Sequence, residues 1–333
     1  MNKEKIHSGL LQAELIGNKV LESLKRSRND LLGHDVFEHA IYIHDGNEVL
    51  IKIIKDKEFV SPNSIVISGM GDLSFKSLDI ENGTKLEFYD DKIASKENGF
   101  TVNIASASIW HPPEFSNESD LLSVEEINLN QRILNDIIYT SPSREGLVPL
   151  LENVEKYGPL EVFVKEQKPT ISEKARPYID VLMWGIFSGD IEAIKRSAGF
   201  ILGLGPGLTP SCDDFLAGLM LSLNNAGASL FWNEPNTVQF FSKVSTVISA
   251  LSKKKTTIYS QSFLNEASLG EGPKTALDLI FSIITKSPDH VAELSKRLIG
   301  VGATSGADIS IGIYYGIRFL TSRIELRDLN EFE

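Results

Sequence analysis

Two glycine-led segments in the C-terminal half constrain the fold of this chain more than any other feature of its sequence. They span residues 203–218 and 300–312, and both contain the pattern Ser-x-x-Asp-x-x-x-Gly. A serine followed three residues later by an acidic residue is typical of a helix start, because the two side chains can satisfy free backbone N–H groups. The pattern therefore predicts two helices with matching first turns, which begin at Ser211 and Ser305, and it makes Ser211 the expected N-cap of the first helix.

The loop before the first of these helices is selected for its backbone shape. Gly203, Gly205 and Gly207 occupy alternate positions, and each glycine inside a helix would cost about 1 kcal/mol relative to alanine. Further along, Gly218 and Gly312 each follow the serine of their segment by seven positions and would let the two helices approach closely. We therefore expect a pseudo-symmetric helix pair whose N-termini lie next to each other.

Adjacent helix N-termini favour the binding of a small anion, since their backbone N–H groups are free and the helix dipole is positive there. A single copy of the pattern more often only changes the direction of the chain, whereas two copies favour a shared binding site. A third helix start follows the basic run 253–255. If it faces the same place, Lys255, Thr256 and Ser260 would supply a cation and hydroxyl donors; the alternative is a solvated basic turn.

The charge balance and the cysteine content exclude several classes of partner and site. A net charge of −12 disfavours nucleic acid and anionic membranes as partners, because both favour a concentrated Lys/Arg face. The single cysteine, Cys212, excludes an intrachain disulfide and a Cys-based zinc cluster. No stretch approaches about 18 consecutive apolar residues, and the first residues lack the apolar run of a signal peptide. We therefore expect a cytoplasmic protein with no membrane segment, metal site or cofactor.

The first third of the chain has the pattern of a β-rich domain. Helical periodicity predicts an opening helix at residues 10–24. Short β-branched runs between turn residues predict strands at residues 40–44, 49–54, 64–67, 85–89 and 100–110. Residues 1–120 are thus expected to form an N-terminal helix plus a small barrel or sandwich, which ends in a polar linker at 114–120.

Helical signals dominate residues 121–333. Ser123 and Glu126 form a predicted capping box at the first helix. Further helices are expected at residues 146–157, 172–187, 190–202, 211–224, 238–251, 258–269, 274–286, 288–299 and 305–322. The chain is therefore predicted to be an α+β protein whose α-helical bundle carries both glycine-led segments.

The most informative motifs of the C-terminal half lie at residues 205–211, 213–214, 218, 256–257 and 304–308. In their order and spacing they resemble those of the AllH family. The resemblance covers residues 190–319, whereas the first third is similar to the family only in architecture. This chain departs from the family pattern at Cys212 and at Ala303. The residues that carry the resemblance are Gly205, Pro206, Gly207, Leu208, Thr209, Pro210, Ser211, Asp213, Asp214, Gly218, Thr256, Thr257, Thr304, Ser305, Gly306, Ala307 and Asp308.

The resemblance implies a subunit of oxamate carbamoyltransferase in anaerobic allantoin degradation, where oxalurate and phosphate are converted to oxamate and carbamoyl phosphate. It implies other subunits of that enzyme as partners, and phosphate, carbamoyl phosphate, oxamate or oxalurate as the small anionic ligand. Asp214 and Asp308 would accept hydrogen bonds from NH2 groups of such ligands and are the expected catalytic residues. The residues expected to bind the substrate are Gly205, Gly207, Thr209, Ser211, Asp213, Thr256, Thr257, Ser260, Thr304, Ser305 and Gly306.

Two alternatives stay open. The chain could be a non-catalytic metabolite-binding or assembly subunit of a multi-subunit enzyme, with the catalytic centre in a partner. It could also be a magnesium-dependent phosphotransferase that uses Asp213 and Asp214 as metal ligands. That reaction needs a nucleotide motif, and the loop at Gly203 neither contains the lysine of a Walker A sequence nor follows a strand as a dinucleotide fingerprint requires.

Overall fold

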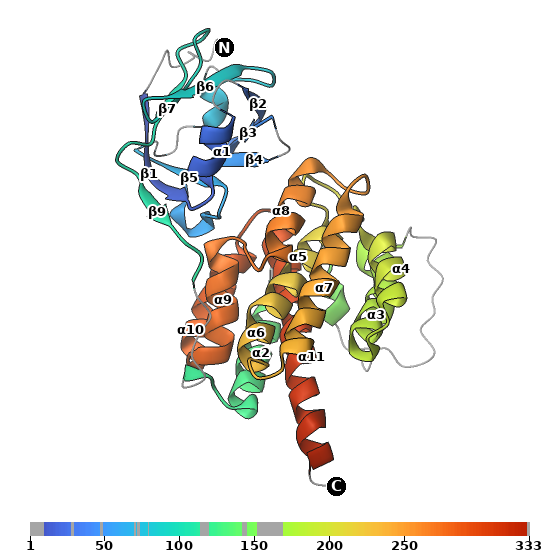
Figure 1. Cartoon of the computed structure of the whole chain (residues 1–333). Helices are drawn as coiled ribbons and strands as arrows, with labels where there is room; N and C mark the ends of the chain where they lie inside the picture. Colours follow the sequence, from blue (N-terminus) through green and yellow to red (C-terminus); the bar gives the residue numbers. More distant parts are fainter. Residues whose placement is uncertain are drawn as a thin grey trace. The chain divides into compact units, whose positions relative to one another are not determined.

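The computed structural model describes residues 10–27, 30–46, 49–69, 71, 74–78, 80–113, 120–141, 145–151 and 169–331. The chain divides into two compact units, Met1–Pro112 and Pro113–Glu333, and each is described by itself. The first unit consists mainly of strands and the second of helices (Figure 1). The predicted α+β class, with a β-rich N-terminal region and a helical C-terminal region, is confirmed.

Nine strands in the first unit form one sheet that closes on itself. Their order is β5-β4-β3-β2-β6-β7-β8-β1-β9, and β5 also pairs with β1, so the sheet is barrel-like. Closure leaves few unpaired backbone groups at sheet edges. The elements of this unit are β1 (Leu10–Gly17), α1 (Val20–Arg26), β2 (Leu31–Val36), β3 (Ala40–His44), β4 (Leu50–Ile54), η1 (Lys57–Phe59), β5 (Ser64–Ser68), η2 (Phe75–Ser77), β6 (Lys85–Tyr89), β7 (Lys92–Ala94), β8 (Thr101–Asn103) and β9 (Ser108–Trp110).

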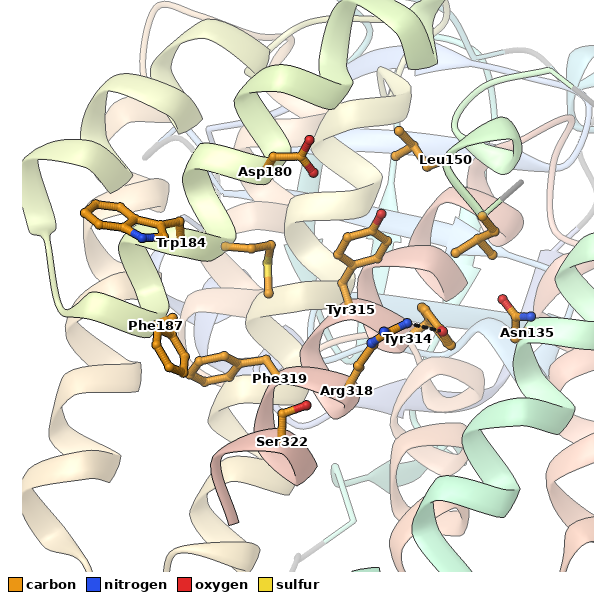
Figure 2. Close-up of a pocket in the computed structure, with 12 residues that line it drawn as sticks. Asn135, Leu150, Asp180, Trp184, Phe187, Tyr314, Tyr315, Arg318, Phe319 and Ser322 are labelled. Carbon is orange, nitrogen blue, oxygen red and sulfur yellow. Dashed lines mark hydrogen bonds between the residues drawn. The ribbon is translucent and has the colours of Figure 1, made fainter. Parts of the chain in front are cut away.

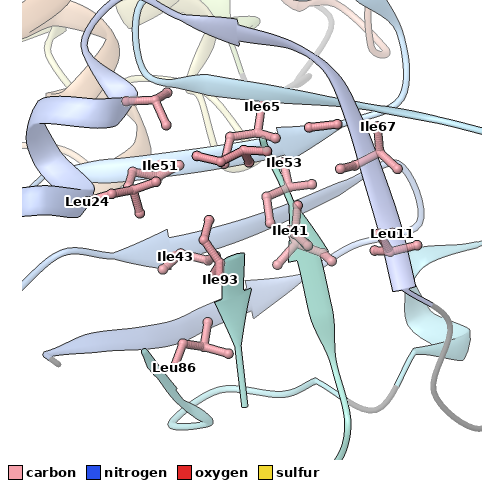
Figure 3. Close-up of a cluster of buried hydrophobic side chains, with 14 of the residues drawn as sticks. Leu11, Leu24, Ile41, Ile43, Ile51, Ile53, Ile65, Ile67, Leu86 and Ile93 are labelled. Atoms are coloured by element: carbon pink, nitrogen blue, oxygen red, sulfur yellow. The ribbon is translucent and has the colours of Figure 1, made fainter. Parts of the chain in front are cut away.

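Isoleucines on facing strands form much of the core of this unit (Figure 3). In β3 every second residue points inward, so Ile41 and Ile43 are fully buried. They lie opposite Ile53 and Ile51 of β4 in an antiparallel register. Because β-branched side chains pack well on a pleated surface, this alternation is visible in the sequence, and the predicted strands β3 and β4 are confirmed.

The helix predicted at residues 10–24 is wrong in its first half. That part is the strand β1, and α1 begins only at Val20. β1 pairs with β5 on one side and with β8 and β9 on the other, so its backbone hydrogen bonds are made within the sheet. Short apolar runs fit both periods in the sequence, and here closure of the sheet favours the strand.

The helical unit begins at the predicted capping box. Ser123 N donates to Glu126 Oε2 at 2.9 Å, and the Ser123 hydroxyl accepts from Glu126 N, so the box is confirmed. The predicted helix at 146–157 is observed only as the 3-10 turn η4, and residues 152–157 lie outside the described residues. The elements are α2 (Val124–Tyr139), η4 (Val148–Leu151), α3 (Ile171–Ser188), α4 (Ile191–Ile201), α5 (Ser211–Asn224), α6 (Ala226–Leu230), α7 (Pro235–Ser252), α8 (Ile258–Ser268), α9 (Lys274–Thr285), α10 (Pro288–Ile299) and α11 (Ser305–Glu331).

The helix α5 lies at the centre of this unit (Figure 1). Every residue from Ser211 to Leu223 is buried, and α7, α8 and α11 pack against the helix. A surface helix would show a polar face, whereas this one is covered on all sides. None of the helices that the structure describes is long and apolar enough to cross a membrane.

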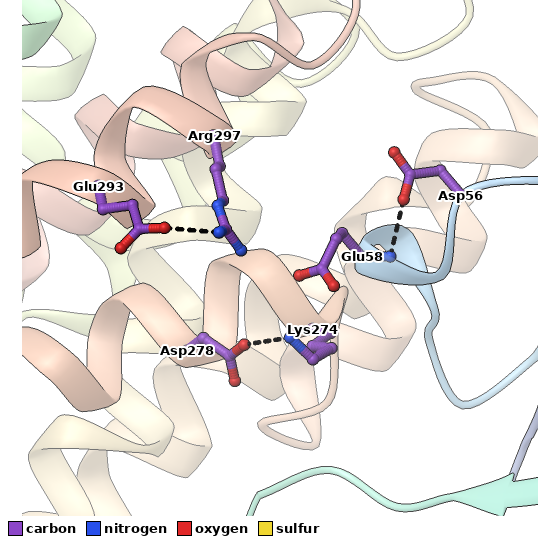
Figure 4. A network of polar contacts seen from close by, with 6 residues as sticks. All are labelled: Asp56, Glu58, Lys274, Asp278, Glu293 and Arg297. Carbon is purple, nitrogen blue, oxygen red and sulfur yellow. Dashed lines mark hydrogen bonds and ion pairs between the residues drawn. The ribbon is translucent and has the colours of Figure 1, made fainter. Parts of the chain in front are cut away.

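Local ion pairs support the exposed faces of the outer elements (Figure 4). On α9, Lys274 Nζ lies 2.7 Å from Asp278 Oδ2, and on α10, Arg297 Nη2 lies 2.6 Å from Glu293 Oε1. In the first unit, Asp56 caps η1. Pairs one helical turn apart typically contribute about 0.3–0.5 kcal/mol, so these contacts stabilise single elements and form no part of the site described below.

Candidate functional site

The helices α5 and α11 leave almost no space between their backbones at two glycines. A Cβ atom on Gly218 would lie 2.1 Å from the carbonyl oxygen of Ile309 in α11. A Cβ atom on Gly312 would lie 2.1 Å from the carbonyl oxygen of Phe215 in α5. Both distances are far below van der Waals contact, so no side chain fits at either position. The predicted close approach of the two helices is confirmed.

The first turns of the two helices face each other through hydroxyl and carboxyl groups. Thr209 Oγ1 lies 3.1 Å from Ser305 Oγ and donates a hydrogen bond of 3.1 Å to Asp214 Oδ2. The Ser305 hydroxyl also interacts with the Asp214 carboxylate, and the Ser211 hydroxyl interacts with the Asp308 carboxylate. Each helix thus supplies the serine that faces the aspartate of the other. The expected pseudo-symmetric pair with adjacent N-termini is confirmed.

Three buried polar atoms at these helix starts make no hydrogen bond to any residue that the structure describes. They are Ser211 Oγ, Ser260 Oγ and Asp308 Oδ2, and their residues are at most 1% exposed. Ser211 faces Asp308, and Ser260 faces Asp213, but neither contact has hydrogen-bond geometry. These atoms therefore have unused hydrogen-bonding capacity. A polar group that stays buried without a partner costs about 1–3 kcal/mol.

Asp213 holds the glycine-rich loop against the start of α8. Its Oδ1 accepts a hydrogen bond from Gly203 N at 2.8 Å, and its Oδ2 accepts one from the Thr256 hydroxyl. Gly203 has a φ of 78°, and a Cβ atom there would lie 2.3 Å from the carbonyl oxygen of Lys255. Both oxygens of Asp213 are therefore used to fix the loop. Among the described residues, no group of three His, Cys, Asp or Glu side chains could hold a metal ion.

The start of α8 lies beside the loop, but its lysine points elsewhere. Thr257 caps α8 by accepting a hydrogen bond from Ser260 N at 3.1 Å, and its own hydroxyl donates to the carbonyl of Leu208. Lys255 Nζ donates to the carbonyl of Gly199 in α4 at 2.7 Å. The lysine therefore interacts with the negative end of the α4 dipole, and the expectation that it supplies a ligand cation is corrected.

Some of the backbone N–H groups at the start of α5 donate hydrogen bonds to carbonyl groups of the preceding loop. Pro210 is the N-cap, with φ −54° and ψ 143°, and it makes no side-chain cap hydrogen bond. The predicted N-cap role of Ser211 is therefore wrong, because the fixed φ of proline suits the position just before the first turn. The N–H groups of residues 212–214 donate to loop carbonyls. Within the described part of the chain, no hydrogen bond uses the N–H of Gly205 or of Gly207.

The start of α11 is held by packing as well as by hydrogen bonds. Asp308 N donates to the carbonyl of Thr304 at 2.9 Å, so Thr304 opens the helix. A Cβ atom on Gly306 would lie 1.8 Å from the carbonyl oxygen of Leu298 in α10. Packing of α11 against α10 alone therefore requires glycine at this position, whether or not it also contacts a ligand.

One contact of the site comes from residues 146–147, which the sequence predicts to be part of a helix and not of the site. Leu147 N donates a hydrogen bond of 2.8 Å to Asp308 Oδ1 across 161 residues of sequence. Gly146, with a φ of 68°, lies so close that a Cβ atom would be 2.6 Å from the same oxygen. The glycine at position 146, followed by a turn, is the one local feature that could have indicated a role for this segment in the site. The residues that sequence reasoning missed are therefore those that cover Asp308.

Burial raises the pKa of all three carboxyl groups of the cluster. It raises the pKa of Asp308 to about 6, against the lowering effect of the hydrogen bond from Leu147 N. It raises the pKa of Asp214 well above the usual range, and the charge of Asp308 adds to this. Burial also raises the pKa of Asp213, against the lowering effect of the hydrogen bonds from Gly203 N and nearby hydroxyls. A protonated carboxyl group can donate a hydrogen bond as well as accept one, so this cluster repels an anion less than three ionised groups would.

The thiol at this helix start is not activated. Cys212 is fully buried. Burial raises the pKa of the thiol, and the charges of Asp213 and Asp308 raise it further. A nucleophilic cysteine needs a lowered pKa, so the geometry gives no support to a role for Cys212 in covalent chemistry.

The fold and the site together define a class of protein: an α+β chain in which two glycine-led helix starts meet over buried carboxyl groups. Residues 201–317 match the family described as oxamate carbamoyltransferase subunit AllH, and residues 12–109 match the AllH family N-terminal domain. The chain belongs to the AllH family. The C-terminal match contains both glycine-led segments. No solved structure matches the chain.

Proposed function

We propose that this chain binds the small anionic substrate of an oxamate carbamoyltransferase at the paired starts of α5 and α11. The enzyme would transfer a carbamoyl group from oxalurate to phosphate, which gives oxamate and carbamoyl phosphate, in anaerobic allantoin degradation. The observation that carries this proposal is the meeting of the two helix starts, where Thr209 Oγ1 lies 3.1 Å from Ser305 Oγ. Family membership supplies the class of reaction.

The anion would be held by uncharged donors. Gly205 and Gly207 have N–H groups that no described residue accepts from, and Thr209, Thr304 and Ser305 are half-buried hydroxyl residues around the same place. Two helix N-termini together supply the equivalent of about one positive charge. Such a site suits phosphate, a carboxylate or the phosphoryl group of carbamoyl phosphate.

The aspartates would orient the NH2 groups of the ligand. Asp308 Oδ2 is the stronger candidate acceptor, because it makes no hydrogen bond to any described residue. Asp214 accepts from Thr209, and its second oxygen would complete the same function. In this arrangement Asp213, Thr256 and Thr257 support the site by fixing the loop and α8, and Ser211 and Ser260 offer the remaining hydroxyl groups.

The test is phosphate-dependent cleavage of oxalurate by the purified chain, alone and together with the other subunits of the enzyme. We expect activity that requires this chain, and we expect phosphate or carbamoyl phosphate to raise its thermal midpoint. An assembled enzyme that cleaves oxalurate equally well without the chain would contradict the proposal.

A non-catalytic assembly subunit is the second candidate, and one observation favours it. Asp213 and Asp308 both make hydrogen bonds that hold separate segments of the chain together, to Gly203 N and Leu147 N respectively. A chain whose buried carboxylates are needed only for folding would support its partners without contacting substrate. Activity of the isolated chain in the assay above would exclude this candidate.

A further inference from the structure

A pocket in the helical unit is lined by none of the residues of the paired helix starts and takes no part in the proposed function. It has a volume of about 680 Å³ and is bounded by α2, α3, η4 and α11 (Figure 2). Pockets of about 300–1,000 Å³ are the usual size for small organic ligands. The pocket is therefore large enough for a ligand with one or two rings.

One wall of the pocket is aromatic and accessible. Trp184 and Phe187 of α3 are 59% and 53% exposed, and Phe319 of α11 lies beside Phe187 (Figure 2). Large aromatic side chains are mostly covered in a folded protein. Here two of them border a hollow, where their faces and edges can pack on a planar ring.

The pocket has one positive and one negative side chain among its lining residues. Arg318 is held in place by donating a hydrogen bond of 3.0 Å from Nη1 to the hydroxyl of Tyr314. Asp180 lies on the far side of Tyr315 from Arg318 (Figure 2). A guanidinium group binds carboxylate or sulfonate oxygens through several N–H donors, and a carboxylate accepts from an N–H or O–H group. The charges therefore favour a ligand that is acidic at one end and carries a donor at the other.

We propose that this pocket binds a planar aromatic acid, with its ring against Trp184 and Phe187 and its acidic group at Arg318. The aromatic wall supplies most of the affinity through packing, and the arginine selects for the acid. None of the lining residues belongs to the proposed carbamoyl-transfer site, so binding here is tested separately from carbamoyl transfer.

The experiment uses two fluorescent probes that differ only in charge. Anilinonaphthalene sulfonate carries a sulfonate on a planar naphthalene ring, and N-phenyl-1-naphthylamine has the same ring system without the sulfonate. We expect saturable binding of the acid to the full chain, about tenfold weaker in Trp184→Ala. Trp232→Ala is the matched control, since Trp232 is 57% exposed and does not line the pocket.

The role of the arginine is tested with the pair of probes. Arg318→Gln should weaken binding of the acid by about five- to tenfold and leave the neutral probe unchanged. Arg297→Gln, which alters a surface ion pair on α10, should affect neither. Equal binding by Trp184→Ala and Trp232→Ala would overturn the proposal. Loss of probe binding when the other subunits are added would also overturn it, because a partner protein would then cover the aromatic wall.

Discussion

The starts of α5 and α11 share one sequence pattern but differ in what surrounds their aspartates. Asp214 in α5 is approached by the hydroxyl groups of Thr209 and Ser305. Asp308 in α11 faces the hydroxyl groups of Ser211 and Thr304 and, in addition, accepts from the backbone of Leu147 at 2.8 Å. Both carboxyl groups have raised pKa values through burial. The aspartates are thus equivalent in the pattern and distinct in their surroundings.

The segments that precede the two helices differ in the same way. Before α5, Gly205 and Gly207 hold φ values of 135° and 95°, and their N–H groups are unused among the described residues. Before α11, a single positive-φ residue, Gly302, opens a short turn. Gly218 and Gly312, which the two glycine-led segments share, are therefore explained by the packing of the helices. The features that could recognise a ligand lie where the two segments differ.

The largest effect is expected at the crossing itself. Gly218→Ala would place a Cβ atom 2.1 Å from the carbonyl oxygen of Ile309, so the helices must separate, at a cost of about 3 kcal/mol or more. Gly199→Ala in α4 is the control, because its nearest contact would be 3.6 Å away, at the flexible end of Lys255. Equal urea midpoints for the two variants would show that the crossing tolerates a side chain.

The next effect separates the two interpretations of Asp308. If it receives an NH2 group of the substrate, Asp308→Asn should lower turnover of the assembled enzyme by about ten- to a thousandfold. If it only anchors Leu147, turnover should barely change, because the amide oxygen still accepts that hydrogen bond. Asp278→Asn, on the surface of α9, should leave turnover unchanged. Near-normal turnover of Asp308→Asn would remove this residue from the catalytic site and weaken the case for Asp214.

A smaller effect is expected from the loop before α5. Gly207→Val adds a side chain that meets no protein atom within 4 Å, so it should leave helix content intact and weaken phosphate binding about tenfold or more, by keeping the anion from the backbone. Gly189→Val is a matched control, because Gly189 also has positive φ and open space around it. Isothermal titration with phosphate makes the comparison. Equal phosphate affinities for the two variants would show that the loop only changes the direction of the chain and does not bind the anion.

Much of the helical unit could be predicted because local signals agree with the final packing. The bounds of α5 match the prediction, and the two crossing glycines were recognised from their spacing. The N-cap of α5 was misassigned, because the spacing of Ser211 and Asp214 imitates a capping box while Pro210 takes the cap position. Two local rules competed there, and the restricted φ of proline decided between them.

The remaining errors have tertiary causes. β1 was predicted as a helix because nothing in its eight residues reveals the strands on either side of it. The contact between Leu147 and Asp308 joins segments 161 residues apart, and no local pattern encodes it. Lys255 was expected to supply a cation if its helix start faced the ligand, but it donates to the carbonyl of Gly199 near the end of α4. In each case the residue interacts with a segment of the same chain that lies far away in the sequence.

The last expected effect is a pH dependence that distinguishes Asp308 from a surface carboxylate. The pKa of Asp308 is about 6 in the folded chain, above the ordinary value of about 3.9 in an unfolded one. Between these values the folded state binds more protons than the unfolded state, so the contribution of Asp308 to stability is fully present below about pH 4 and is lost as the pH rises through 6. Relative to wild type, Asp308→Asn should therefore gain on the order of 2 kcal/mol of unfolding free energy between pH 4 and pH 7. Urea unfolding at a series of pH values measures this difference, with Asp278→Asn as the surface control. A constant difference between Asp308→Asn and wild type would mean that Asp308 ionises normally when folded, and burial would then no longer separate it from a surface carboxylate.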